Sequence, residues 1–461
     1  MIITGVIALM LKGTKMKRKI MSKLLDWKRN SNGKTAALIT GARRVGKSYI
    51  AEEFAKKEYK ASLIVNFADA DDSLRELFEH PPRELDTFFV MLAGYYGVDL
   101  VPKDSLIVFD EVQLMPKARE MIKRLVADGR YHYIETGSLM SIRENTKDIL
   151  IPSEEHEIKL NPMDFEEFLW AIGEEQAYEA VRYAYEHRQA LGQAMHRKMM
   201  TLFRQYIIVG GMPQAVAEYV DSRNFKNVDQ IKRDILKLYR DDIYKHGGND
   251  SAKIEQIFNE IPAQLSQVNK RFMFSNLSDT ARYREYAEAL MWLADSKIVN
   301  LCYNTTEPSV GLTTRKDMAA FKCYQGDVGL LLSQTFNEKT LAKDEIYRKL
   351  LFNKLEFNNG MITESVVGQM LVASGHPLFY YYSTEDGKTE IDFLIVKDEI
   401  TTRHNILPIE VKSGSANRIA SLDKYRRKFS QQVGMSYVLY DGDVEVDENV
   451  TYLPLYMAGL L

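Results

Sequence analysis

Cysteine and histidine are scarce in this sequence. Cys302 and Cys323 are the two cysteines in 461 residues, and they lie in no Cys-x-x-Cys or Cys/His cluster. Two cysteines cannot build a disulfide framework, and neither they nor the eight histidines have the spacing of zinc ligands. Such sparse cysteine use is typical of a reducing compartment, so we expect a cytoplasmic protein.

Long hydrophobic runs are missing as well. The N-terminal stretch MIITGVIALML has eleven apolar or small residues, too few to span a bilayer, and the charges follow it instead of preceding it as in a signal peptide. We therefore expect no membrane segment. Met16 and Met21 are alternative start positions, so residues 1–20 are a candidate artefact of start-codon choice.

The chain also lacks a strong charge of either sign. It has 61 Lys and Arg against 64 Asp and Glu, a net charge of −3. This balance argues against a protein that coats nucleic acid by bulk charge, although local basic patches such as KGTKMKRK remain. Hydrophobic residues make up 45% of the chain, enough for sizeable cores, and the length predicts about two to four domains.

The first part of the chain alternates short apolar runs with helical patterns such as SYIAEEFAKKEY and PKAREMIKRLVADG. The predicted strands are residues 35–40, 61–67, 104–111, 131–138 and 156–163. Strands that alternate with helices indicate βαβ units. Because the strands are almost continuously apolar, we expect a parallel sheet covered on both faces.

The rest of the chain changes character twice. Residues 164–246 have a helical pattern, and residues 251–304 hold three short helical patterns that run into a strand and the loop TTEPSVGLTTRK. This order is typical of a winged helix-turn-helix. After Leu341, a helix around GMITESVVGQMLVASG precedes the strand-like LFYYYST, TEIDFLIV and ILPIEVKSG, which predicts a further small α/β unit.

A glycine-rich octet lies between the first predicted strand and the first predicted helix. Gly41, Ala42, Arg43, Arg44, Val45, Gly46, Lys47 and Ser48 fit the pattern G-x-x-x-x-G-K-[ST]. Glycines let such a loop curl so that its backbone N–H groups surround an anion at the start of a helix. Lys47 would supply charge to the β- and γ-phosphates, and the Ser48 hydroxyl would be a ligand of Mg²⁺. The octet therefore predicts a site for ATP and Mg²⁺.

Two further strand ends supply the rest of such a site. LIVFDE ends in Asp110, placed to hold Mg²⁺ mostly through water, and Glu111, placed to orient or activate the attacking water. YIETGS ends in Thr136 and Ser138, either of which could hydrogen-bond the γ-phosphate or the water, or simply cap the strand. The pattern predicts an ATPase in which Lys47 and Glu111 are catalytic.

Four charged residues near the C-terminus have the order of a second site. Glu364 lies in a predicted helix, Asp392 in the strand EIDFLIV, and Glu410 and Lys412 in the strand LPIEVKS, where residues two apart share a face. Asp392 and Glu410 could hold Mg²⁺, with Glu364 beside them and Lys412 polarising water or the scissile phosphate. The set resembles the PD-(D/E)xK phosphodiesterases. Ordinary alternation on half-exposed strands is the other interpretation.

One basic segment follows that set. YRRKF at residues 425–429 interleaves cations with aromatic residues and could contact a phosphate backbone. A solvated helix face is the alternative.

Segments along nearly the whole chain resemble one family. They are, in order, GARRVGKS, IVFDEVQLMP, YIETGSLM, LNPMDFEEFLWAIG, YIIVGGMPQAV, FKCYQGDVGLL and EIDFLIV with IEVKSG. In these segments the chain resembles AAA-type P-loop ATPases fused to a C-terminal domain of the DUF4143 type. The resemblance implies a helical lid after the ATPase core and a nucleotide contact at Pro213. No Gly-x-x-Arg sensor is visible in the lid, and Arg130 and Arg143 are candidates only by position for an arginine from a neighbouring subunit.

We therefore expect an α/β protein with a P-loop NTPase parallel sheet, a helical lid, a winged-helix-like middle and a small restriction-endonuclease-like domain. The expected boundaries are 1–30 for an N-terminal extension, 31–163 for the ATPase core, 164–250 for the lid, 251–335 for the winged-helix-like domain and 336–461 for the DUF4143-type domain. The expected function is Mg²⁺-dependent ATP hydrolysis that gates action on DNA through the nuclease-like domain. The alternative is a nucleotide-switched interaction protein whose C-terminal domain binds a partner, such as another protein, without catalysis.

Overall fold

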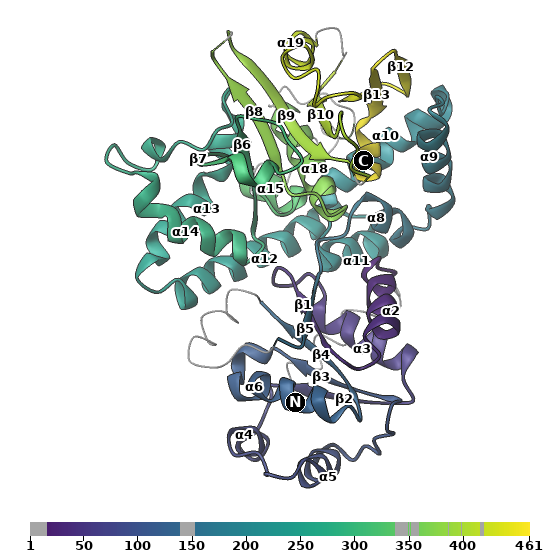
Figure 1. Cartoon of the computed structure of the whole chain (residues 1–461), viewed down its shortest axis with the longest axis vertical. Helices are drawn as coiled ribbons and strands as arrows, with labels where there is room; N and C mark the ends of the chain where they lie inside the picture. The colour runs from purple at the N-terminus through teal and green to yellow at the C-terminus, as the bar shows by residue number, and fades with distance from the viewer. Residues whose placement is uncertain are drawn as a thin grey trace. The chain divides into compact units, whose positions relative to one another are not determined.

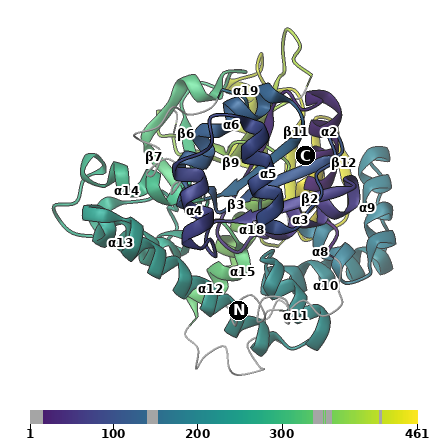
Figure 2. The ribbon, with the colours of Figure 1, turned by 90° about the horizontal axis from the view of Figure 1, so that it is seen from below.

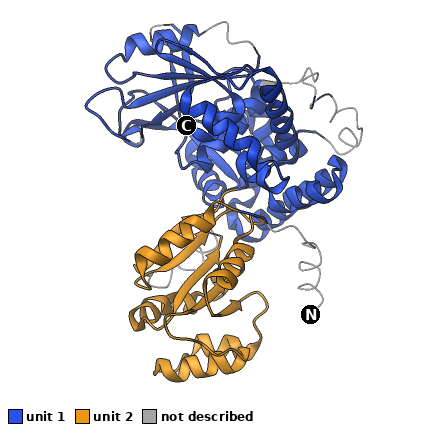
Figure 3. Ribbon diagram, turned by 90° about the vertical axis from the view of Figure 1, so that its right-hand side faces the viewer, with its two compact units in different colours: residues 1–17, 162–461 blue, residues 18–161 orange. Residues whose placement is uncertain are grey.

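The structure is a computed structural model that describes residues 16–138, 153–336, 349, 351, 359–385, 387–397, 399–414 and 419–461. The chain divides into two compact units (Figure 3). Residues 18–161 form the N-terminal unit, and the C-terminal unit comprises the described residues from 162 to 461 together with Met16 and Lys17. Within the described residues, no helix has the length and apolar character that crossing a membrane requires.

The N-terminal unit is an α/β unit built on a parallel sheet of five strands (Figure 1). Its strands are β1 (Ala36–Thr40), β2 (Ala61–Asn66), β3 (Ser105–Asp110), β4 (His132–Gly137) and β5 (Glu155–Lys159). Its helices are α2 (Ile20–Ser31), α3 (Lys47–Glu58), α4 (Asp72–Glu79), α5 (Leu85–Tyr96), the 3₁₀ turn η1 (Val112–Leu114) and α6 (Pro116–Asp128). The strand order is β2-β3-β4-β1-β5. Every pairing is parallel, which confirms the parallel sheet that the sequence predicts.

Both faces of this sheet are covered (Figure 2). Ile107 and Phe109 of β3 pack into a core with residues of α4, α5 and α6, whereas Leu106 and Val108 pack into a second core with residues of α2 and α3. Neighbouring residues of a strand point to opposite faces, so a strand buried on both faces needs an unbroken apolar sequence. This requirement explains the near-continuous apolar runs.

Residues before the predicted ATPase core contribute to this unit. Helix α2 packs Leu24 and Trp27 into the second core, and the buried Arg18 guanidinium donates hydrogen bonds to the carbonyls of Val45 (3.1 Å) and Asn161 (2.7 Å). The N-terminal unit therefore begins at Arg18. Part of the predicted N-terminal extension is a structural element that holds the glycine-rich loop.

The C-terminal unit begins with a run of helices, and further helices lie between its strands and after the last one. They are α8 (Phe165–Ala171), α9 (Glu175–His187), α10 (Gln193–Val209), α11 (Pro213–Ser222), α12 (Phe225–His246), η2 (Gly248–Asp250), α13 (Ser251–Ser266), η3 (Phe274–Asn276), α14 (Tyr283–Asp295), η4 (Leu312–Arg315), α15 (Val328–Thr335), α18 (Asn359–Ala373), α19 (Ala420–Lys428) and η5 (Leu455–Leu460). The region predicted as a lid is helical, with α8 to α12 inside it. Its role as a lid stays a prediction.

A mixed sheet of eight strands completes the C-terminal unit (Figure 1). Its strands are β6 (Val299–Thr305), β7 (Lys316–Gln325), β8 (Phe379–Ser383), β9 (Thr389–Val396), β10 (Ile406–Val411), β11 (Ser436–Tyr440), β12 (Glu445–Asp447) and β13 (Val450–Pro454). Their order is β12-β13-β11-β10-β9-β8-β6-β7. Strand β6 pairs with β7 on one side and, through Tyr303 and Asn304, with β8 on the other.

This sheet corrects the expected winged-helix arrangement. The β6–β7 hairpin is not the wing of an independent domain, because the pairing of β6 with β8 joins it to the strands of the DUF4143-type region. The sheet thus crosses the predicted boundary between residues 335 and 336. The other domain boundaries stay predictions.

Candidate functional site

The glycine-rich loop connects β1 to α3, as the pattern predicts. Gly46 has a φ of 98° and caps α3, a backbone conformation that glycine adopts without steric cost. Gly41 is needed for a different reason, because a Cβ there would lie 2.3 Å from the carbonyl oxygen of Leu160. Arg44, with a φ of 68°, is a non-glycine residue in the left-handed region, a strain that often marks a functional loop.

The side chains of the glycine-rich loop differ in their environments. Val45 is buried in the core beneath the loop, so its contribution to a ligand would come from its backbone, as it would for Ala42. The Lys47 ammonium donates to the carbonyls of Gly41 and Ala42, both at 3.0 Å, and therefore lies over the loop. Arg43 is exposed. The loop thus joins the start of a helix to a lysine, an arrangement that suits phosphate groups.

Ser48, Asp110 and Thr136 meet at the ends of three elements. The hydroxyl of Ser48, in α3, donates to Asp110 Oδ1 at 2.7 Å, and the Thr136 hydroxyl, at the end of β4, donates to the same oxygen. Burial raises the pKa of Asp110, while these two hydrogen bonds oppose the rise. Hydroxyl and carboxylate oxygens are ligands that Mg²⁺ prefers, so these residues fit the ion. Ser138 directly follows β4, and residues 139–152 after it lie outside the part of the chain that the structure describes.

Glu111 follows β3 in a restrained position. Its φ is 54°, in the left-handed region, and its backbone N–H lies 3.4 Å from the Thr136 hydroxyl oxygen. The side-chain amide of Gln113 donates to its carboxylate. Sequence reasoning missed Gln113, although its place two residues after Glu111 is visible in the sequence. The fixed backbone and the amide orient the carboxylate that we predict to act on water.

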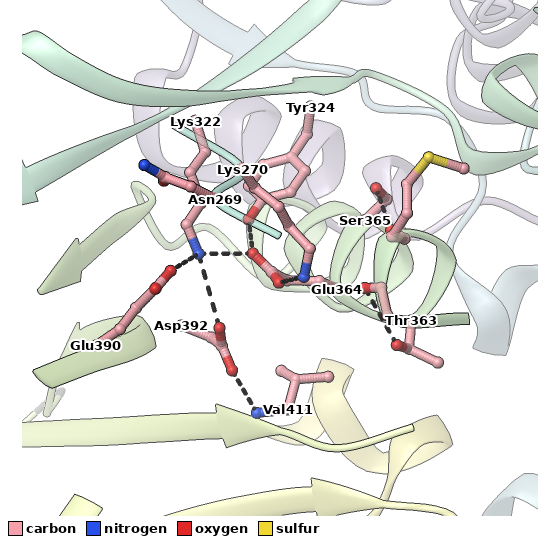
Figure 4. A network of polar contacts seen from close by, with 12 residues as sticks. Asn269, Lys270, Lys322, Tyr324, Thr363, Glu364, Ser365, Glu390, Asp392 and Val411 are labelled. Carbon is pink, nitrogen blue, oxygen red and sulfur yellow. Dashed lines mark hydrogen bonds and ion pairs between the residues drawn. The ribbon is translucent and has the colours of Figure 1, made fainter. Parts of the chain in front are cut away.

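The second predicted set also comes together, but around a lysine (Figure 4). The ammonium of Lys322, in β7, lies 2.8 Å from Glu364 Oε1 and 3.0 Å from Glu390 Oε1. It lies 3.6 Å from Asp392 Oδ1. The Lys322 side chain is only 1% exposed. Burial opposes its positive charge, yet the surrounding carboxylates hold the pKa of Lys322 well above its ordinary value, so the ammonium stays charged.

Glu364 has further partners. The ammonium of Lys270, which follows α13, and the hydroxyl of Tyr324 both donate to its carboxylate (Figure 4). Burial alone would raise the pKa of Glu364, but Lys322 and Lys270 lower it to about 2. The carboxylate is therefore ionised and fully paired inside the protein.

Asp392 and Glu410 occupy neighbouring strands. Asp392 Oδ2 accepts a hydrogen bond of 2.8 Å from the backbone N–H of Val411, which ties β9 to β10. Lys412 Nζ lies 2.5 Å from Glu410 Oε1. Burial, together with the nearby Asp392, raises the pKa of Glu410 to about 8 although Lys412 opposes the rise. The predicted glutamate and lysine thus pair with each other.

The Lys322 ammonium lies between two of the predicted carboxylates. It occupies the position in which a divalent cation bound to both Glu364 and Asp392 would lie. No cluster of three or more His, Cys, Asp or Glu residues suited to a metal occurs in the part of the chain that the structure describes. The predicted metal ligands Asp392 and Glu410 lie on the paired strands β9 and β10, and their role as metal ligands stays a prediction.

Replacing Glu410 tests its buried environment. In the unfolded chain its pKa is near 4.5, and in the folded protein it is about 8. Its protonation therefore favours folding below about pH 4.5, and this contribution is lost as the pH rises towards 8. We expect Glu410→Gln to gain stability relative to wild type between pH 5 and pH 8, by about 1–4 kcal/mol at the higher pH. Urea unfolding at pH 5 and at pH 8 measures the free energy of unfolding of both proteins. An equal difference between variant and wild type at the two pH values would contradict the raised pKa of Glu410. Glu445→Gln, an exposed glutamate in β12, is the control.

Sequence reasoning missed Lys322, Lys270 and Tyr324. A signal for Lys322 exists, because a lysine interrupts the buried run from Phe321 to Gln325 in β7. A charged residue in such a run needs an opposite charge beside it. Lys270 lies between α13 and β7 and carries no comparable signal in its sequence surroundings.

The predicted nucleotide contact around Pro213 lies in the C-terminal unit. Gly211 N–H donates to Asp327 at 2.6 Å, and a Cβ on Gly211 would meet the carbonyl oxygen of Met163 at 2.1 Å. Asp327 also caps α15 through Leu330 N–H. Close packing thus explains Gly211, and Pro213 begins α11. A nucleotide contact at Pro213 stays a prediction.

Arg130 and Arg143 are the two candidates by position for an arginine supplied by a neighbouring subunit. Arg130 pairs with Asp128 and Asp86 ahead of β4, at the edge of the sheet opposite to the glycine-rich loop. Arg143 lies outside the described residues.

Three family models match parts of the chain. Residues 33–169 match an AAA domain, residues 200–340 match DUF8612, a domain of unknown function, and residues 359–457 match DUF4143, also a domain of unknown function. No curated protein matches the chain.

Several solved structures are similar at low identity. The Walker-type ATPase of Pyrococcus abyssi is 12% identical, with a TM-score of 0.43, over 70% of this chain and 96% of that one. The Aeropyrum pernix ORC1 protein in complex with DNA is 10% identical, with a TM-score of 0.28, over 72% and 97%. The Thermotoga maritima RuvB Holliday junction branch migration motor is 12% identical, with a TM-score of 0.30, over 62% and 89%.

The family matches agree with the geometry of the N-terminal unit, in which a glycine-rich loop, an aspartate and a glutamate lie at the ends of parallel strands. Residues 33–169 therefore form an AAA-type P-loop domain, and residues 359–457 form a DUF4143 domain that follows it in the same chain.

Proposed function

We propose that this protein is a nucleotide-operated switch, in which binding and hydrolysis of ATP change what the C-terminal unit binds. The observation that carries the choice between switch and nuclease is the Lys322 ammonium among Glu364, Glu390 and Asp392. A nuclease of the PD-(D/E)xK kind needs Asp392 as a ligand of its metal ion, and the Lys322 ammonium beside Asp392 competes with that ion.

The N-terminal unit supplies the residues for ATP hydrolysis. The N–H groups of the loop and the Lys47 ammonium would bind the phosphates, and Ser48 with Asp110 would hold Mg²⁺. The ion would neutralise charge on the β- and γ-phosphates. Glu111, oriented by Gln113, would accept hydrogen bonds from the attacking water and take up its proton. Thr136 fixes Asp110 and borders the same position.

The C-terminal unit would act by binding. Its carboxylates are neutralised by Lys322, Lys270 and Lys412 inside the fold, so the cluster holds β7, α18, β9 and β10 together. Fixed, internally paired groups stabilise a surface without offering the open metal positions that hydrolysis of a phosphodiester needs.

A second candidate, an ATP-gated nuclease acting on DNA, keeps one supporting observation. Glu364, Asp392, Glu410 and Lys412 do lie on adjacent elements, and the Asp392 side chain is 17% exposed. A movement of Lys322 would be required before a metal could bind to both Glu364 and Asp392.

A cleavage assay separates the two candidates. Linear, supercoiled and branched DNA are incubated with Mg²⁺, with and without ATP, and wild type is compared with Lys47→Ala and with the pair Asp392→Ala, Lys412→Ala. We expect ATP turnover in wild type, its loss in Lys47→Ala, and no cleavage by any of them. Cleavage that is lost in the Asp392, Lys412 variant would favour the nuclease. Wild type without ATP turnover would overturn the switch itself.

A further inference from the structure

A cavity in the C-terminal unit lies beside α19, and none of the carboxylates around Lys322 is among its described lining residues. Its volume is about 310 Å³, and its lining comes from β8, β9, the connection between them and α19. Three cations, Lys424, Arg427 and Lys428, and the hydroxyl residues Ser383, Thr389 and Tyr425 are among the lining residues. None of the lining residues that the structure describes is acidic. The cavity is therefore a positively charged hollow with hydrogen-bond donors.

Two of the three cations have no ionic partner within the described part of the chain. Lys428 lies 3.4 Å from Glu385, an ion pair at the rim. Lys424 and Arg427, in contrast, form no ion pair with any described residue, and Arg427 makes a single hydrogen bond, through Nε to the carbonyl of Asp423. The remaining donors of these side chains are available to an anion.

Tyr425 provides the second, independent observation. Its side chain is 0% exposed and packs against Tyr381 and Phe429, yet its hydroxyl has no hydrogen-bond partner among the described atoms. Burial raises the pKa of Tyr425 well above its ordinary value, so the hydroxyl keeps its proton and is a donor. A buried hydroxyl without a partner is rare because it costs free energy. A ligand in the cavity would supply the missing acceptor.

We propose that this cavity binds a phosphate group carried on a nucleotide. Phosphate oxygens accept hydrogen bonds from guanidinium, ammonium and hydroxyl groups at once, which is the donor set found here. The volume exceeds that of a phosphate alone, so the group would bring its ester substituent with it. The inference deepens the proposed function, on which it rests, by naming what the C-terminal unit would bind.

The test measures binding of three probes to the full chain carrying Lys47→Ala, so that the glycine-rich loop contributes little. The probes are inorganic phosphate, a nucleoside monophosphate and a fluorescent single-stranded oligonucleotide. Tyr425→Phe keeps the ring and removes the hydroxyl, and Arg427→Ala removes one cation. Lys237→Ala, an exposed lysine of α12, is the control.

We expect both cavity variants to weaken binding about tenfold, and Arg427→Ala to lower the salt dependence of oligonucleotide binding by about one unit of slope. Tyr425→Phe should at the same time raise the melting temperature of the free protein, because the unpartnered hydroxyl is gone. If the two variants weaken binding of the small probes alone, the ligand is a free nucleotide or phosphate. If they weaken binding of the oligonucleotide alone, the ligand is a nucleic-acid strand. Either result supports the site.

The proposal is overturned if no probe binds, or if all probes bind Tyr425→Phe and Arg427→Ala as they bind the parent. ATP turnover of wild type is measured in parallel. Its absence would remove the proposed switch and leave the binding result standing, so the two failures are distinguishable.

Discussion

Glu111→Gln is expected to retain ATP binding and to lose ATP hydrolysis by about a hundredfold or more, because a positioned general base contributes on this scale. Glutamine keeps the length of the side chain and its contact with Gln113, but it cannot take a proton from water. The phosphate-binding loop and the pair of Ser48 with Asp110 are unchanged. Steady-state turnover and equilibrium binding of a fluorescent ATP analogue measure the two properties separately.

The control for Glu111→Gln is Glu120→Gln, an exposed glutamate on α6 that pairs with Lys117. We expect this variant to keep wild-type turnover. Turnover of Glu111→Gln within about threefold of wild type would contradict the assigned role, since so small a change lies below the contribution of a general base.

Lys322→Met is expected to destabilise the C-terminal unit by about 3–5 kcal/mol, because it leaves buried carboxylates without their cation. Methionine is close to lysine in length and fills the same space, so the loss reports the charge. Glu364 is 2% exposed and would keep only Lys270 as an ionic partner. Chemical denaturation near neutral pH measures the change, and the loss should shrink at low pH, where the freed carboxylates can bind protons.

The control for Lys322→Met is Lys316→Met on the same strand, an exposed lysine that lies over the ring of Tyr303. We expect it to cost about 1 kcal/mol or less. If Lys322→Met is as stable as wild type, the ammonium does not hold the cluster together.

A companion variant, Lys322→Ala, opens space between Glu364, Glu390 and Asp392. We expect Mn²⁺, added without nucleotide, to raise the melting temperature of this variant and to leave wild type unchanged, because three carboxylates would then face a space without the Lys322 ammonium and could bind a hard cation. Stabilisation of wild type by Mn²⁺ that disappears in Asp392→Asn would show that the native cluster is a metal site after all.

The first site could be predicted from the sequence because its parts are local. Gly41 to Ser48 are contiguous, and Asp110 and Thr136 each follow an apolar strand. In a parallel sheet the carboxyl ends of all strands meet at one edge, so the pattern of strands already implies that these residues converge. What the sequence did not reveal is the support around them. Arg18, which donates to the Val45 carbonyl, lies in the basic patch KGTKMKRK, which carries no sign of such a role in its sequence.

The second site could be predicted only in part. Glu364, Asp392, Glu410 and Lys412 are neighbours as expected, because antiparallel pairing of β9 with β10 brings the two strand residues side by side. Lys322 belongs to a strand that the sequence placed in another domain. Its approach depends on the pairing of β6 with β8, which joins residues far apart along the chain and leaves no periodic signal.

The sequence by itself therefore determined the ATPase domain: the order of its strands and helices, the phosphate loop, and the carboxylates at the strand ends. Short-range pattern and loop chemistry were sufficient there. The tertiary structure alone decided that a lysine lies among the C-terminal carboxylates. That outcome depends on a long-range strand pairing that carries the Lys322 ammonium to within 2.8 Å of Glu364, where buried opposite charges attract each other strongly.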